Sequence, residues 1–216
     1  TLRVEVYYKK YDNLTLTDTS NVLVPINNNI SVPMGNNSLV SNNGSGYAQG
    51  LDVFWKDKKT IKGVDYWISY TYLDTKRKWQ NYPKEVTPPF AASHTASLVF
   101  KKFFEKINLS TGFAYSYATG RPYYNPTNPD FMSDRTMDYN SLGINAAYLR
   151  QIKNCFAVLA ISVTNTLGST QIYGYRSSFD ALRRTAIMPP AKRFFFIGLF
   201  LSFGQDRSKE VIDNNN

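Results

Sequence analysis

The chain has 216 residues, with 25 lysine and arginine residues against 16 aspartate and glutamate residues, so its formal net charge is +9. Hydrophobic residues make up 43% and charged residues 19%, which excludes a chain kept disordered by its charge. The single cysteine, Cys155, excludes an intrachain disulfide framework. Basic residues lie in short clusters between apolar segments, where solvated charge is ordinary. We therefore expect no nucleic-acid partner.

Apolar residues alternate with small or polar residues in eight segments. A period of two is typical of β-strands whose two faces meet different environments. In chain order the predicted strands are residues 2–8, 51–55, 64–72, 96–100, 109–117, 142–148, 159–163 and 195–203. We expect each segment to approach the ~9–11 residues that a tilted strand needs to cross a bilayer.

The predicted connections alternate between long and short. The long ones are residues 11–46, 74–92, 119–137 and 165–191, and the short ones are 57–62, 103–108 and 151–155. An up-and-down barrel in an outer membrane has this arrangement, with short periplasmic turns and long external loops. The chain opens directly in a strand pattern, without a signal peptide. We therefore expect either a mature product or a piece of a longer protein.

The two faces of the predicted strands differ. One is broad and apolar, and the other consists mostly of small residues such as Gly112, Ser116, Gly143 and Ala160. Aromatic residues near both ends of the apolar face suit the two lipid interfaces. The predicted membrane girdle is Tyr8, Trp55, Tyr66, Tyr70, Tyr72, Phe100, Tyr115, Tyr148 and Phe203. Strands in lipid must close into a barrel to pair their backbone groups; the alternative is that these aromatics fill a soluble core.

Four stretches carry a resemblance to a known family. They are residues 2–14 (LRVEVYYKKYDNL), 63–73 (GVDYWISYTYL), 117–123 (YATGRPY), and 163–168 (VTNTLG) followed by 172–175 (IYGY). In this order, ahead of a terminal amphipathic strand, they resemble the C-terminal part of the barrel of a TonB-dependent outer-membrane receptor. The resemblance covers nearly the whole chain.

The resemblance implies an all-β, antiparallel, up-and-down transmembrane barrel of about 22 strands, of which this chain holds about eight. The partners it implies are a plug domain, the remaining strands from the same or another chain, and TonB through an N-terminal part outside this chain. We also expect outer-membrane lipid at the apolar face and a surface lipoprotein as a further candidate partner. We assign residues 1–204 to the barrel and 205–216 to a polar periplasmic tail. A complete, closed eight-stranded barrel is the alternative, but small inner residues suit a plug or a wide channel better.

The sequence contains no catalytic constellation: it has no nucleophile elbow with a Ser-His-Asp set, no glycine-rich phosphate loop and no HExxH. We therefore predict that the protein is not an enzyme and needs no cofactor. Asp130, Asp134 and Asp138 share a loop with Arg121 and Arg135. Solvated charge is the expected role of these residues, and a site for a cation or a polar ligand is the alternative. His94 is expected to be a girdle or loop residue rather than a metal ligand.

The aromatic residues of the long connections are the best candidates for function. They alternate with asparagine, arginine and proline, a composition that suits stacking and hydrogen bonding to a chelate, a glycan or a peptide. The predicted ligand-binding residues are Trp79, Tyr82, Arg121, Tyr123, Tyr124, Tyr173 and Tyr175, with Phe131 and Phe179 nearby. The alternative is that they only pack loop against loop. The predicted function is uptake of a nutrient by a receptor, or else binding or structural support without transport.

Overall fold

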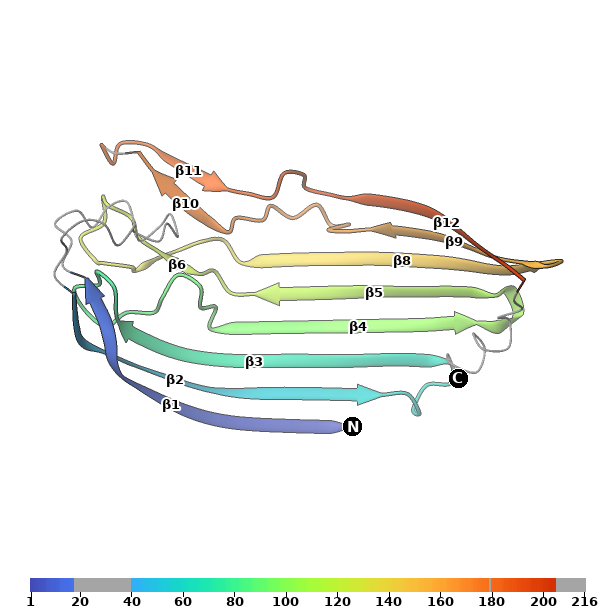
Figure 1. The fold of residues 1–216 in the computed structure, drawn as a ribbon, viewed down its shortest axis with the longest axis horizontal. Coiled ribbons are helices and arrows are strands. Elements are labelled where there is room, and N and C mark those ends of the chain that lie inside the picture. Colours follow the sequence, from blue (N-terminus) through green and yellow to red (C-terminus); the bar gives the residue numbers. More distant parts are fainter. Residues whose placement is uncertain (18–39, 179, 205–216) are drawn as a thin grey trace.

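The protein folds as an antiparallel sheet of eight strands, with two-stranded ribbons in the loops (Figure 1). The computed structural model describes residues 1–17, 40–178 and 180–204, so the predicted tail 205–216 and Phe179 lie outside the described residues. In spatial order the large sheet contains β1 (Leu2–Thr17), β2 (Val40–Asp57), β3 (Val64–Lys78), β4 (His94–Phe104), β5 (Leu109–Ala118), β8 (Tyr139–Ile152), β9 (Cys155–Val163) and β12 (Phe195–Phe203). Each strand pairs with the next long strand along the chain, which confirms the predicted all-β, up-and-down fold.

The connections sort by length between the two ends of the sheet. The turns β2–β3, β4–β5 and β8–β9 lie at one end, here called the short-turn end, and the long connections lie at the other, the long-loop end (Figure 1). A single turn of 3-10 helix, η1 (Glu105–Ile107), occupies the β4–β5 turn. The alternation of loop lengths that the sequence predicts is confirmed. No helix among the described residues is long and apolar enough to span a membrane.

The predicted connection 11–46 is wrong at both ends. β1 continues to Thr17 and β2 already begins at Val40, with register shifts on either side of Leu14. Strand pairing needs only backbone hydrogen bonds, so a ladder can continue past the point where the apolar alternation stops. β3 likewise runs on to Lys78, into the predicted connection 74–92.

The other two long connections contain short strands that the sequence pattern does not predict. β6 (Pro122–Tyr123) pairs with β7 (Asp134–Arg135), and β10 (Gly174–Ser177) pairs with β11 (Arg184–Ile187). Two to four residues are too few to show a period. These ribbons give the loops at the long-loop end a fixed backbone.

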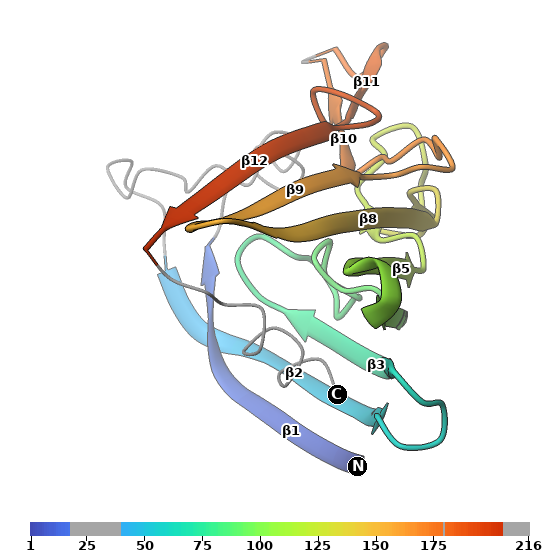
Figure 2. The same cartoon turned by 90° about the vertical axis from the view of Figure 1, so that its right-hand side faces the viewer.

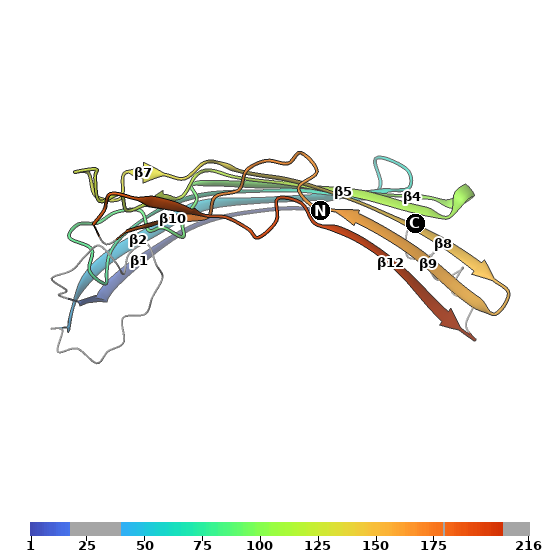
Figure 3. The same ribbon diagram turned by 90° about the horizontal axis from the view of Figure 1, so that it is seen from above.

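The sheet is curved and open (Figures 2 and 3). Within the described residues β1 pairs only with β2, and β12 only with β9, so the two form opposite edges. The alternative of a closed eight-stranded barrel therefore does not hold for this structure. Unpaired backbone groups along two edges are unfavourable in lipid. This observation favours the prediction that these strands belong to a larger barrel.

Strand register gives the sheet two faces of different chemistry. On the apolar face one row of paired residues crosses six strands through Leu2, Trp55, Ile68, Leu98, Tyr115 and Leu142. The opposite, small-residue face carries a row of serines, Ser69, Ser97, Ser116 and Ser141. Val6, Ile197 and Phe203 on the apolar face are 73–80% exposed. Large apolar residues therefore lie on the outside of this sheet, and no second layer covers them in the described structure.

The β12 strand departs from this pattern on its small-residue face. Phe196 and Phe200 project on the same side as Gly198, and a Cβ on this glycine would lie 2.7 Å from the Phe196 ring. The two rings thus lie over the glycine. The small-residue character predicted for this side of the strand holds at Gly198 and Ser202 only.

Candidate ligand-binding site

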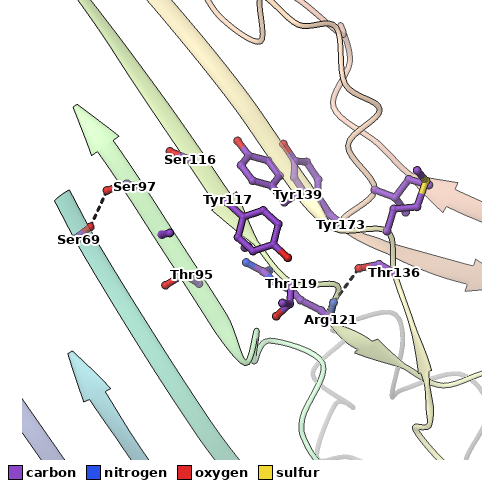
Figure 4. Close-up of a pocket in the computed structure, with 14 residues that line it drawn as sticks. Ser69, Thr95, Ser97, Ser116, Tyr117, Thr119, Arg121, Thr136, Tyr139 and Tyr173 are labelled. Carbon is purple, nitrogen blue, oxygen red and sulfur yellow. Dashed lines mark hydrogen bonds between the residues drawn. The ribbon is translucent and has the colours of Figure 1, made fainter. Parts of the chain in front are cut away.

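A cavity of about 420 Å³ lies at the long-loop end of the sheet. Its wall includes hydroxyl-bearing residues of neighbouring strands, with loop residues beside them (Figure 4). Among the residues that line it are Ser69, Thr95, Ser97, Ser116, Arg121, Tyr139 and Tyr173. The Ser69 and Ser97 hydroxyls lie 2.7 Å apart and form a hydrogen bond across β3 and β4. Short side chains at these paired positions leave the space that the cavity occupies.

The backbone that presents Arg121 is fixed by several hydrogen bonds. The Arg121 amide donates to the Thr136 hydroxyl at 2.9 Å, and the Thr136 amide donates to the Arg121 carbonyl at 2.9 Å. Gly120 precedes it, and a Cβ there would lie 1.9 Å from the Thr136 carbonyl oxygen, so only glycine fits without a backbone shift. The Arg121 guanidinium itself is exposed and has no hydrogen-bond or ion-pair partner among the described residues. It is therefore free to bind an anionic group.

Asp138 joins the same loop to β5. Its carboxylate accepts hydrogen bonds from the Tyr117 hydroxyl at 2.7 Å and from the Gly120 amide at 2.8 Å. These two bonds, that of Tyr117 first, hold the pKa of Asp138 below its usual range. The Asp138 carboxylate is thus already hydrogen-bonded on both oxygens. Its role in the structure is to hold the β5–β8 connection against β5.

Three of the predicted ligand-binding residues, Trp79, Tyr82 and Tyr124, lie in a packed cluster between two loops. The Tyr82 ring makes edge contacts with Trp79 at 6.3 Å and with Phe131 at 5.4 Å, measured between centroids. Tyr82 and Met132 are only 4–5% exposed. Burial raises the pKa of Tyr82 to about 12. This loop cluster connects the β3–β4 connection with the β5–β8 connection.

Two further predicted residues, Tyr123 and Tyr175, contact each other with their rings tilted by 46° and their centroids 4.6 Å apart. The Arg184 guanidinium lies 4.4 Å from the Tyr175 centroid and 5.4 Å from that of Tyr123, and it donates to the Tyr123 hydroxyl. Tyr123 is buried, which raises the pKa of its phenol. This second cluster connects the β5–β8 connection with the β10–β11 ribbon.

The structure therefore separates the predicted ligand-binding residues into two groups. Arg121 and Tyr173 line the cavity, and Tyr173 is 48% exposed. The other five lie in the two aromatic clusters, where most of their contacts are to other loops. Whether any of the seven contacts a ligand remains a prediction. Sequence reasoning missed Tyr139 and the serines and threonines of the cavity wall; small polar residues at the long-loop ends of the strands were the available signal.

All nine predicted girdle residues project from the apolar face. Trp55 and Tyr66 contact each other edge to face at 5.5 Å near the short-turn end. At the other end the Tyr70 hydroxyl and His94 Nδ1 are 2.8 Å apart, and the Tyr72 ring lies 5.2 Å from the His94 ring. Within the described part of the chain no three His, Cys, Asp or Glu side chains are grouped so that they could hold a metal ion. Contact of these aromatics with lipid remains a prediction.

An up-and-down antiparallel sheet with an exposed apolar face, and with its long loops at one end, has the architecture of a transmembrane β-barrel. The family described as "TonB dependent receptor-like, beta-barrel" matches residues 1–165. The chain therefore belongs to the TonB-dependent receptor β-barrel family, as the sequence resemblance predicts. A comparison with curated proteins found no match.

A solved structure, the outer membrane transporter YddB from Escherichia coli, has a similar fold. The TM-score is 0.61 at 11% sequence identity, over 92% of this chain and 30% of that one. This chain thus spans less than a third of that transporter's length. The family and this neighbour indicate an outer-membrane location. Both are receptors or transporters rather than enzymes.

Proposed function

We propose that the chain forms the C-terminal strands of an outer-membrane receptor that binds a nutrient at its long-loop end and takes it up in an energy-coupled manner. The observation that carries this proposal is the cavity of about 420 Å³ at that end of a barrel of this family. In this arrangement the apolar face contacts outer-membrane lipid and the girdle residues lie at the two lipid interfaces. The small-residue face lines the barrel interior.

The complete receptor contains parts that this chain does not supply. The two edges formed by β1 and β12 pair with the remaining strands of a barrel of about 22 strands, closing it. A plug domain occupies the interior, TonB acts through the N-terminal part, and a surface lipoprotein is a further partner at the long loops. The family match supports the plug and TonB in general terms.

The chemistry of the cavity favours a polar ligand with an anionic group. Arg121 is the single cation among the described residues that line it, and a guanidinium binds a carboxylate or a phosphate through paired hydrogen bonds. The Ser97, Ser116 and Thr95 hydroxyls can donate to or accept from a hydroxyl-rich ligand, and the Tyr173 ring offers a surface for stacking. An acidic glycan, a chelate or a peptide carboxylate meets these requirements.

Growth tests can identify the ligand class and then test the site. A strain that lacks the complete receptor is grown with iron chelates, oligosaccharides or peptides as the sole source of the nutrient. On the class that it can no longer use, Arg121→Gln should lower uptake about tenfold, because a hydrogen bond to a charged group contributes roughly 1.5–3 kcal/mol. Arg176→Gln, on β10 and outside the cavity lining, is the matched control. Equal uptake by the two variants would show that Arg121 does not contribute to the ligand-binding site.

Energy coupling is tested separately from binding. Removing the N-terminal TonB-contacting segment of the complete receptor should abolish uptake and leave ligand binding to purified outer membranes unchanged. If uptake continued at the original rate, the alternative of a binding or structural barrel without active transport would be favoured instead.

A further inference from the structure

We propose that the short-turn half of the small-residue face carries a docking site for an acidic segment of the plug domain. The site consists of Lys56 on β2, Asp65 and Trp67 on β3, and Lys101 on β4. It rests on the proposed function in one respect: that this face lines the interior of a barrel with a plug in it. It lies away from the ligand cavity, whose lining contains none of these four residues.

The register places the four side chains on one face. Lys56 pairs with Trp67 across β2 and β3, and Asp65 pairs with Lys101 across β3 and β4. The Trp67 indole lies between the two lysines, with each ammonium nitrogen 5.2 Å from its centroid. This separation is within the range of a cation–π contact. The aromatic ring therefore holds two positive charges at defined positions, one on either side of it.

The positive charge of this cluster is only partly balanced. Asp65 Oδ2 is 3.6 Å from the Lys56 nitrogen and 3.5 Å from that of Lys58, so one carboxylate faces three lysines once Lys101 is included. Asp65 Oδ1 is buried and has no hydrogen-bond partner among the described residues. One carboxylate is therefore too little to balance these lysines, and the cluster presents surplus positive charge.

Other carboxylates on the same face are already engaged. Glu5 pairs with Arg3 at 3.5 Å, and Asp52 accepts a hydrogen bond from the Thr71 hydroxyl at 2.6 Å. A plug segment that covers these lysines removes part of their hydration, which is unfavourable for an uncompensated charge. A carboxylate on that segment supplies the missing negative charge.

The surface beside the lysines suits a polypeptide segment. From Trp67 the paired row continues through Val99, Ala114 and Gly143, so the side chains become smaller away from the indole. A backbone can approach closely over such a row while its carboxylates reach Lys56 and Lys101. An acidic segment of the plug meets both requirements, whereas an anionic ligand in transit would satisfy the lysines only while it passes.

The test compares the lysines of the site with Lys102, which follows Lys101 in sequence but projects from the opposite face. In the complete receptor in outer-membrane vesicles, Lys56→Gln combined with Lys101→Gln should speed amide hydrogen exchange in the plug about tenfold, because its anchoring contacts are lost. Lys102→Gln is the matched control, since Lys102 lies on the apolar face, 4.9 Å from the Phe104 ring. Exchange in the control should match the unmodified receptor. High salt should reduce the difference between the double variant and the unmodified receptor.

Three outcomes would overturn the proposal. The first is plug exchange that is unchanged in the double variant. The second is an equal effect of Lys102→Gln, which would show a general effect of charge. The third is reduced uptake of the ligand with unchanged plug exchange, which would assign the lysines to the ligand's path. Heat-modifiable mobility on a denaturing gel verifies that each barrel is folded. The result is independent of Arg121, so failure here and failure of the proposed ligand site can be told apart.

Discussion

Large apolar and aromatic side chains meet opposite environments in two regions of this molecule. On the apolar face of the sheet Val6 is 80% exposed and Phe203 is 74% exposed. In the loop cluster Tyr82 is 4% exposed and Met132 is 5% exposed. Water favours burial of apolar surface, and the loops follow that rule. The sheet departs from it, as we expect if lipid surrounds the strands.

The comparison also separates two uses of aromatic residues. In the loops, edge and stacking contacts such as Tyr82 to Phe131 fix one connection against another. On the strands, Trp55 and Tyr72 lie near the ends of an aliphatic band, where an amphipathic ring suits a lipid interface. Aromatic content alone would not distinguish these roles, but alternation along a strand does. The following substitutions test the two regions against each other, from the largest expected effect to the smallest.

Removing the centre of the loop cluster should have the largest effect. Tyr82→Ala deletes a buried ring and should destabilise the packed loops by about 3–5 kcal/mol, the range for large aromatic truncations in cores. Limited proteolysis of residues 79–93 in the folded barrel measures the opening. Tyr82→Phe keeps the ring and should remain resistant. Equal resistance of the alanine variant would show that the cluster does not hold the loops.

Placing a charge on the apolar face should lower stability slightly less than Tyr82→Ala does. Ile161→Arg on β9, where the side chain is 43% exposed, should destabilise the barrel in bilayers by about 2–4 kcal/mol if it lies near the membrane midplane. Ser162→Arg, on the next residue and the opposite face, should cost under about 1 kcal/mol. Denaturant unfolding from lipid vesicles compares the two. If Ser162→Arg lowered stability more than Ile161→Arg, the small-residue face and not the apolar face would be the one in contact with lipid.

The boundary between the sheet and the loops should be sensitive to one methyl group. Gly120→Ala would place a Cβ 1.9 Å from the Thr136 carbonyl, and the shift it forces should cost about 1–3 kcal/mol and weaken ligand binding at Arg121. Gly143→Ala is the matched control, because a Cβ there would lie 3.8 Å from the Ala114 and Val163 carbonyl oxygens, an ordinary contact. Thermal unfolding and ligand binding by both variants provide the measurement. Equal behaviour would mean that the loop can adjust without loss.

The smallest effect concerns high pH. Burial raises the pKa of Tyr82 from 10.0 to about 12, so folding favours its neutral form. The stability that this adds is complete below pH 10 and is lost as the pH rises toward 12. Tyrosinate absorbance should therefore show a late titration step that is missing in Tyr82→Phe. Titration of all tyrosines near pH 10, with no late step, would contradict the burial of this phenol.

Alternation was sufficient to predict the sheet, but the loops needed contacts that sequence does not show. All eight long strands follow from a period of two, because each separates an apolar side from a side of mostly small or polar residues. The end of β1 and the start of β2 could not be predicted from this period. Strand pairing there continues through polar residues, as far as Thr17 on β1 and starting at Val40 on β2. The position of Arg121 in the cavity depends on Thr136 and Asp138, and that of Tyr82 in a buried cluster depends on Phe131 and Met132, all of them distant in sequence. Composition placed both residues in loops and could not distinguish their surroundings.

Lipid contact with the apolar face can be measured most directly with two of the three tryptophans. Trp55 and Trp67 occupy adjacent rows of the sheet on opposite faces. Variants that keep only one of them, with the other and Trp79 changed to phenylalanine, are placed in vesicles whose acyl chains carry bromine, which quenches nearby indoles. We predict strong quenching of Trp55 and little of Trp67. Quenching of Trp67 that equals or exceeds that of Trp55 would contradict the account.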